Sequence, residues 1–164
     1  MQNFLIVLSF IFLVQGKPPE LEYSLLNQVV GENGIKSINS EFYSPKNKFR
    51  TYREFSLAFE QDILDPTKSF NLDSLITRQQ IRAFEQSLQT EKPRKVKPKM
   101  IQAQLSKTGY QLSFPLIQEG KNEEIYGLVF ENVMSMESGG VILKLYRKEG
   151  KKWTLLHETY VAIS

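Results

Sequence analysis

The last third of the chain, residues 110–164, constrains the fold most strongly because its residue types alternate as they do in β-strands. The segments 140–148 and 152–164 are rich in β-branched, aromatic and other apolar residues, and a short polar segment separates them. Gly150 lies in that short segment and can take the positive φ that tight turns need. The two segments therefore predict a β-hairpin at the end of an antiparallel sheet.

Further strands are expected immediately upstream of this hairpin. Apolar and polar side chains alternate in residues 110–114, and residues 100–105 precede them across a hairpin turn expected at 106–109. Residues 124–134 are apolar on both faces, which is typical of a central strand that is covered on both sides. We expect helices to cover one face of this strand and a neighbouring segment to cover the other.

The N-terminal half, residues 17–90, shows mainly helical periodicity. Apolar residues recur at helical spacing over 20–30 and over 51–63, so each segment predicts an amphipathic helix. Between these two helices, the mixed pattern of residues 35–43 predicts a short strand.

A third helix is expected to begin at Thr77, because Thr77 and Gln80 have the spacing of a capping box. Asp73 is an equally good start. Together the patterns predict an α+β fold, with about three N-terminal helices packed on one face of an antiparallel sheet of roughly four to six strands. The closest named architecture is the cup of nuclear-transport-factor-2-like and cystatin-like folds, an analogy that concerns the fold alone.

The chain divides into a leader and a single domain. Residues 4–14 form an apolar run that is too short to cross a bilayer as a helix and fits the core of a signal peptide. Residues 1–16 are therefore predicted to be a signal peptide, with a buried N-terminal strand or helix as the alternative. The expected parts of the domain at 17–164 are a helical half at 17–90, a basic linker at 91–99 and a β-meander at 100–164.

The predicted leader indicates a compartment, and the composition excludes several kinds of site. A cleaved signal peptide predicts export to the periplasm or the extracellular space, with no membrane span left in the mature chain. The chain has no cysteine, which excludes disulfides, thiolate metal ligands and lipidation at a cysteine. The net charge of +3 neither requires nor forbids an anionic partner, and no nucleic-acid partner is expected of an exported protein.

The C-terminal third has an ordered set of motifs: a strand that ends in Pro115, a strand at 125–130, a Gly-containing loop, and a strand that begins with Lys152 and Trp153. This order resembles that of a group of small exported bacterial proteins with a helical N-terminal half and a C-terminal β-meander. The group has no assigned activity, so the resemblance implies a localisation and an architecture without a mechanism. Its members often have a cysteine pair in the loop that corresponds to residues 135–140, which this chain lacks.

His157 is the only histidine and therefore the first candidate for acid–base chemistry. On a strand it shares a face with Leu155 and Thr159, whereas Glu158 points to the opposite face. A general base needs an orienting partner and a pocket, so a structural role is the favoured interpretation. One histidine without cysteine leaves only scattered carboxylates as metal ligands, and no nucleotide-binding motif occurs. No catalytic residue, metal or cofactor is expected.

The linker at 91–99 is the most basic segment of the chain. Its basic residues are Lys92, Arg94, Lys95, Lys97 and Lys99. Two prolines in the segment disfavour a helix, and the like charges repel one another. A solvated connector is the favoured interpretation. The alternative is a loop that binds a polyanion through charge, with strong salt dependence.

These observations predict an exported globular domain that is not an enzyme and that binds another protein or a cell-envelope component, or has a structural role there. One alternative is a small-ligand-binding cup or an enzyme of unknown chemistry. Another is a polyanion-binding module that uses residues 92–99. A deep pocket that contains His157 or two convergent acids would favour the cup, whereas a filled interior would favour the non-catalytic domain.

Overall fold

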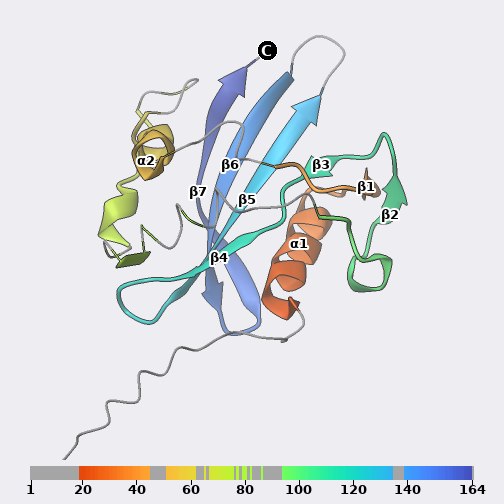
Figure 1. Ribbon diagram of the computed structural model, residues 1–164, viewed down its shortest axis with the longest axis horizontal. Coiled ribbons are helices and arrows are strands. Elements are labelled where there is room, and N and C mark those ends of the chain that lie inside the picture. Colours follow the sequence, from red (N-terminus) through yellow and green to blue (C-terminus); the bar gives the residue numbers. More distant parts are fainter. Residues whose placement is uncertain are drawn as a thin grey trace, which may run out of the picture.

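The computed structural model contains a twisted antiparallel sheet with one helix on each face (Figure 1). The structure describes residues 19–44, 51–61, 65, 67–75, 77, 79–80, 82, 86, 94–134 and 139–163. The predicted signal peptide at 1–16 lies outside these residues. The elements in chain order are α1 (Glu20–Glu32), β1 (Ser37–Asn39), α2 (Tyr52–Glu60), the 3-10 helices η2 (Leu72–Ser74) and η3 (Pro98–Met100), β2 (Gln104–Ser106), β3 (Gln111–Leu112), β4 (Leu116–Glu119), β5 (Ile125–Met134), β6 (Gly139–Glu149) and β7 (Lys152–Ile163).

Five strands form the main sheet in the order β3-β5-β6-β7, and β4 pairs with β5 farther along the edge that β3 occupies. The pairs β5–β6 and β6–β7 are antiparallel and extend over nearly the whole length of these strands. The β6–β7 hairpin closes where Glu149 lies opposite Lys152, and Gly150 in its turn has a φ of +60°. The predicted antiparallel sheet, C-terminal hairpin and central strand at 124–134 are therefore confirmed.

One face of the sheet is covered by α1, which agrees closely with the helix predicted at 20–30. The buried residues of α1 are Tyr23, Leu25, Leu26, Val29 and Val30. They share a core cluster with Val129 of β5 and Tyr146 of β6. Trp153 at the start of β7 donates its indole N–H to Ser24 Oγ and its backbone N–H to Gln28 Oε1, each at 2.7 Å. The only tryptophan thus joins α1 to the sheet.

The other face is covered by α2, which begins with a capping box between Thr51 and Glu54 and is shorter than the predicted 51–63. Phe59 of α2 and Leu72 of η2 belong to a second core cluster. Its strand residues are Tyr126, Leu128, Phe130, Val141, Leu143 and Leu145. The expectation that helices cover only one face, as in a one-sided cup, is wrong, because β5 and β6 alternate apolar side chains toward both faces and each face needs a cover.

The expectation of about three helices is not supported, since only two α-helices, α1 and α2, are delimited among the described residues, and outside them only residues 79, 80, 82 and 86 are α-helical. Most of the segment expected to form the third, 77–90, lies outside the described residues. At its start, Thr77 N–H donates to Gln80 Oε1 at 2.7 Å and Gln80 N–H donates to Thr77 Oγ1 at 3.3 Å. The predicted capping box is therefore present, whereas Asp73 lies in the 3-10 helix η2.

The hairpin expected across 106–109 is wrong, because β1 lies between the two segments that were expected to pair. β1 is parallel to β2 along its whole length, and Ile38 of β1 also bridges to Tyr110. The chain crosses the β1 backbone at Gly109, where an added Cβ would lie 2.4 Å from the carbonyl carbon of Ile38. A glycine is required at this position because the backbone of Ile38 occupies the space that a Cβ atom would need. The strand expected at 100–105 is accordingly reduced to β2.

The described part of the basic linker, residues 94–99, lies along the segment that follows β1. Phe42 N–H donates to the Arg94 carbonyl and Val96 N–H donates to the Ser40 carbonyl, each at 3.0 Å. Val96 is buried in the core on the α1 side. These bonds hold the linker backbone against the domain and leave its charged side chains exposed.

Candidate functional site

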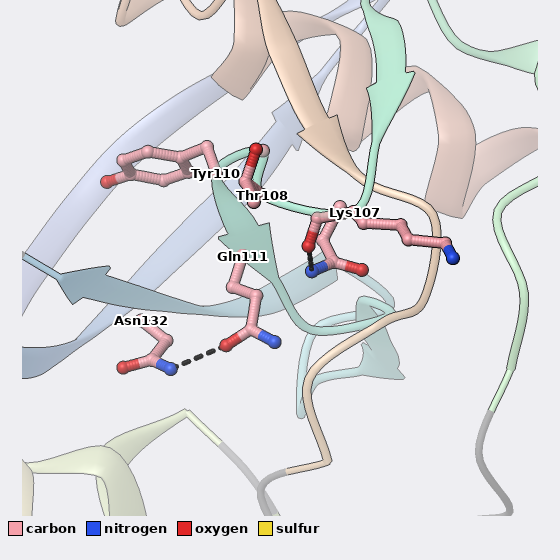
Figure 2. A pocket seen from close by; sticks show the side chains of 7 residues that line it. Lys107, Thr108, Tyr110, Gln111 and Asn132 are labelled. Carbon is pink, nitrogen blue, oxygen red and sulfur yellow. Dashed lines mark hydrogen bonds between the residues drawn. The ribbon is translucent and has the colours of Figure 1, made fainter.

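A hollow of about 480 Å³ opens where β1, the turn after β2, β3 and β5 meet (Figure 2). The residues that line it are Asn39, Lys107, Thr108, Gly109, Tyr110, Gln111 and Asn132. They come from three separate parts of the sequence, which meet because the turn crosses β1 at Gly109. Its polar side-chain groups include the amides of Asn39, Gln111 and Asn132, and we call it the polar hollow.

Two amides face each other at the wall of the polar hollow (Figure 2). Gln111 of β3 is opposite Asn132 of β5 in the sheet register, and Asn132 Nδ2 donates to Gln111 Oε1 at 2.6 Å. The Gln111 amino group and the Asn132 carbonyl make no further hydrogen bond within the described ranges of the chain. The remaining acceptor of Asn132 and the remaining donor of Gln111 therefore lie at opposite ends of the bonded pair (Figure 2).

The opposite wall is held together by hydrogen bonds between β1 and the turn. Asn39 Nδ2 donates to the Lys107 carbonyl at 3.0 Å, and Thr108 N–H donates to Ser106 Oγ at 3.2 Å. These bonds fix the backbone that carries the Lys107 and Thr108 side chains. The two bonds thus hold this wall of the hollow in one arrangement.

Tyr110 lies on the opposite side of the strand from Gln111 (Figure 2) and reaches a buried carboxylate. Its hydroxyl donates to Glu131 Oε2 at 2.9 Å. Glu131 Oε1 lies 2.9 Å from Lys144 Nζ, and only 2% of the Glu131 side chain and 9% of the Lys144 side chain are exposed. Burial, and then the charge of Glu131, raise the pKa of the Tyr110 hydroxyl far above its usual range, so that it donates as a neutral phenol.

The Glu131–Lys144 pair was not predicted from the sequence. The sequence does contain an indication of the pair, since Glu131 and Lys144 are each a single charged residue within an apolar stretch of β5 or β6. The register brings the two charges to the same face, and Asn33 Nδ2 at the end of α1 adds a bond to Glu131 Oε1 at 3.4 Å. Both carboxylate oxygens accept from protein donors, which suits a structural ion pair rather than a general base.

The structure brings three of the predicted basic residues to a second hollow, of about 300 Å³, which we call the basic hollow. Its lining residues are Pro19, Tyr23, Arg94, Lys95, Lys97 and Phe114. The Arg94, Lys95 and Lys97 side chains are exposed. Lys99 lies in η3 and is not part of the lining, and Lys92 lies outside the described residues.

His157 lies among aromatic rings on the α2 face of the sheet, and it lines neither hollow. Its ring stacks on that of Phe70 with centroids 5.3 Å apart and lies 5.7 Å from that of Phe59. Glu158 points to the other face, where its Oε2 is 3.9 Å from Lys144 Nζ. His157 is half-buried, and these contacts pack its ring against two aromatic side chains.

The acid at the start of β5 is also engaged within the protein. Glu124 Oε2 accepts from the Tyr126 hydroxyl at 2.6 Å, and Glu124 Oε1 lies 3.5 Å from Arg147 Nη1. Burial, and then the hydrogen bond to Glu124, raise the pKa of Tyr126 to about 12. Among the residues that the structure describes, no group of three or more His, Cys, Asp or Glu side chains could hold a metal ion.

No helix within the described part of the chain is long and apolar enough to cross a membrane. Comparison of the chain with family models, with curated proteins and with solved structures finds no match.

Proposed function

We propose that the protein is an exported, non-catalytic binding domain whose polar hollow holds an uncharged glycan of the cell envelope. The observation that carries this proposal is the amide pair of Gln111 and Asn132, which lines the hollow and leaves one donor and one acceptor without a hydrogen bond among the described residues. Sugar hydroxyls both donate and accept, and an N-acetyl group has one donor and one acceptor. Either group satisfies the amide pair without needing a charge.

The size of the polar hollow is suited to a small molecule or to the end of an oligosaccharide. Its volume of about 480 Å³ lies within the range of about 300–1,000 Å³ that is usual for ligand sites. The Thr108 hydroxyl and the Lys107 ammonium are further donors at its rim. A glycan that enters the hollow therefore meets hydrogen-bonding groups on both walls.

The non-catalytic part of the proposal rests on how the candidate acids and bases are used. His157 packs against Phe59 and Phe70, and Glu131 is bound by Tyr110 and Lys144. The two core clusters fill the space between the sheet and its helices. This filled interior favours a binding domain over the alternative of a catalytic cup.

Export and kinship with the small exported bacterial proteins belong to the same proposal. They are supported by the apolar run at 4–14 and by the order of strands in the C-terminal third. A bacterial envelope is rich in polymers of N-acetylated sugars. An exported domain whose hollow is lined by side-chain amides is suited to bind them.

The test is a titration of the isotope-labelled protein with the trimer of N-acetylglucosamine. We expect the side-chain amide signals of Gln111 and Asn132 to shift as the sugar is added. The Asn132→Ala variant should bind roughly two- to twelvefold more weakly, because one hydrogen bond contributes about 0.5–1.5 kcal/mol.

A matched control for this titration is Gln102→Ala, which removes an exposed side-chain amide that does not line the hollow. Its affinity should equal that of the unaltered protein. Equal losses in both variants, or no binding of neutral sugar oligomers at all, would contradict the glycan proposal. The trimer should also be recovered intact after incubation, and its hydrolysis would favour the enzyme alternative.

A further inference from the structure

The basic hollow has the features of an anion site and is separate from the polar hollow. Arg94, Lys95 and Lys97 border it, and their backbone is fixed before any ligand binds. In addition to the two bonds between residues 94–96 and the segment after β1, Lys97 N–H donates to the Tyr23 hydroxyl at 2.8 Å. Ordering of the backbone therefore adds little to the entropy cost of binding.

The Arg94 guanidinium is also held in place. Its central carbon lies 4.3 Å from the centroid of the Phe114 ring, in a cation–π contact. Phe114 is itself wedged edge-on against Phe42 and Tyr23, with centroids 5.2 Å and 6.0 Å away. Because the ring covers one face of the guanidinium, its N–H groups remain directed outward in the plane, where they can bind two oxygens of one anion.

The three basic side chains have no acidic partner among the described residues. The basic residues that form ion pairs within the described ranges are Arg53, Lys144 and Arg147. Glu41 lies opposite Lys95 in an isolated antiparallel bridge but forms no ion pair with it. Three cations around one hollow attract a multiply charged oxyanion more strongly than a single carboxylate. The hollow of about 300 Å³ is at the lower end of the usual size for a ligand site.

We propose that the basic hollow binds phosphate or sulfate groups carried by an anionic polysaccharide. Arg94 supplies paired donors through its fork, and Lys95 and Lys97 supply point charges to the remaining oxygens. The inference does not depend on the neutral glycan site, because the two hollows share no lining residue.

The experiment uses heparin as a sulfated probe, polyphosphate as a phosphate probe and dextran as a neutral probe. With three cation contacts and a slope of about −0.7 per contact, affinity should fall roughly twentyfold between 50 and 200 mM salt. Binding of one charged polymer and not the other would identify the group that is recognised. Equal binding of dextran would overturn the proposal.

The decisive variant combines Arg94→Gln, Lys95→Gln and Lys97→Gln. Its matched control replaces the exposed residues Lys36, Lys68 and Lys151 by Gln, so that each variant loses three charges from a formal net charge of +3. We expect the first variant to bind at least tenfold more weakly with almost no salt dependence, and the control to lose less than threefold. Equal losses would show that only net charge matters and would overturn the proposal.

A conservative variant separates geometry from charge. Arg94→Lys keeps the charge at Arg94 but loses the flat fork that stacks on Phe114. We expect severalfold weaker binding with an unchanged salt slope. Affinity equal to that of the unaltered protein would overturn the role of the stacked guanidinium. Thermal unfolding of every variant checks the fold, and binding of the N-acetylglucosamine trimer should be unaffected, which distinguishes failure of this site from failure of the polar hollow.

Discussion

Replacing Lys144 by Met tests whether the buried ion pair stabilises the sheet. Met has nearly the length of Lys and fills the same space, but it leaves Glu131 without its cation. The Glu131 side chain is only 2% exposed, so water cannot take the place of the ammonium group. Removal of one partner from a buried pair destabilises a protein by about 3–5 kcal/mol.

The lower end of this range applies here because Glu131 keeps two other donors. The Tyr110 hydroxyl remains 2.9 Å from Oε2, and Asn33 Nδ2 lies 3.4 Å from Oε1. We therefore expect Lys144→Met to lower the free energy of unfolding by about 3 kcal/mol. For a domain of this size the corresponding fall in Tm is roughly 6–12 °C. The double variant Glu131→Gln with Lys144→Met should recover most of the loss, since no charge is then buried.

The assay is urea unfolding followed by the fluorescence of Trp153, the only tryptophan. Trp153 belongs to β7 and is buried against α1. The control is Arg53→Met, which removes an exposed ion pair with Glu60 and should cost less than about 1 kcal/mol. If Lys144→Met also costs less than about 1 kcal/mol, or if the double variant is less stable than the single one, the argument from desolvation is refuted.

Three further predictions test other parts of the structure. Gly109→Ala should destabilise the domain by about 1–3 kcal/mol in urea unfolding, because the added Cβ would meet the Ile38 backbone. The control Gly31→Ala in α1 has open space around the added Cβ and should stabilise the domain by about 0.5–1 kcal/mol. Equal effects of the two variants would contradict the crossing of the chain over β1 at Gly109. Because the pKa of Tyr126 is raised from 10.0 to about 12, its contribution to stability is complete below pH 10 and is lost as the pH rises toward 12, so Tyr126→Phe should reduce the alkaline loss of stability; an unchanged pH profile would refute this. Intact-mass measurement of the exported protein should give a chain that starts at Lys17, and a retained N-terminal methionine would refute cleavage.

Local sequence patterns were sufficient for the elements whose partners are close in the chain. Gly150 between two alternating runs predicted the β6–β7 hairpin, because a two-strand turn depends on a few adjacent residues. Helical spacing predicted α1 for the same reason, and Thr77 with Gln80 predicted a capping box that the hydrogen bonds confirm. Alternation on both faces also identified β5 as a central strand.

Pairing between distant segments could not be predicted in this way. The turn at 106–109 has the composition of a hairpin, yet β1 occupies the space between its two arms, and nothing local indicates that insertion. The side on which each helix packs depends on the total apolar surface of both sheet faces. A helix pattern alone contains no information about that choice.

The residue types of both candidate sites are visible in the printed sequence, but their grouping is not. The basic run at 91–99 predicted a solvated connector, with an anion-binding loop as the alternative. Only the tertiary structure shows that Arg94 stacks on Phe114 and that three of its cations share one hollow. Gln111 and Asn132 meet through sheet register, and Glu131 meets Lys144 through the next strand pair. Interactions between residues close in the sequence determine the helices, the turns and the alternation of side chains along a strand. The register of the strands and the crossing of the chain at Gly109 determine which distant polar groups become neighbours, and those neighbours form the sites.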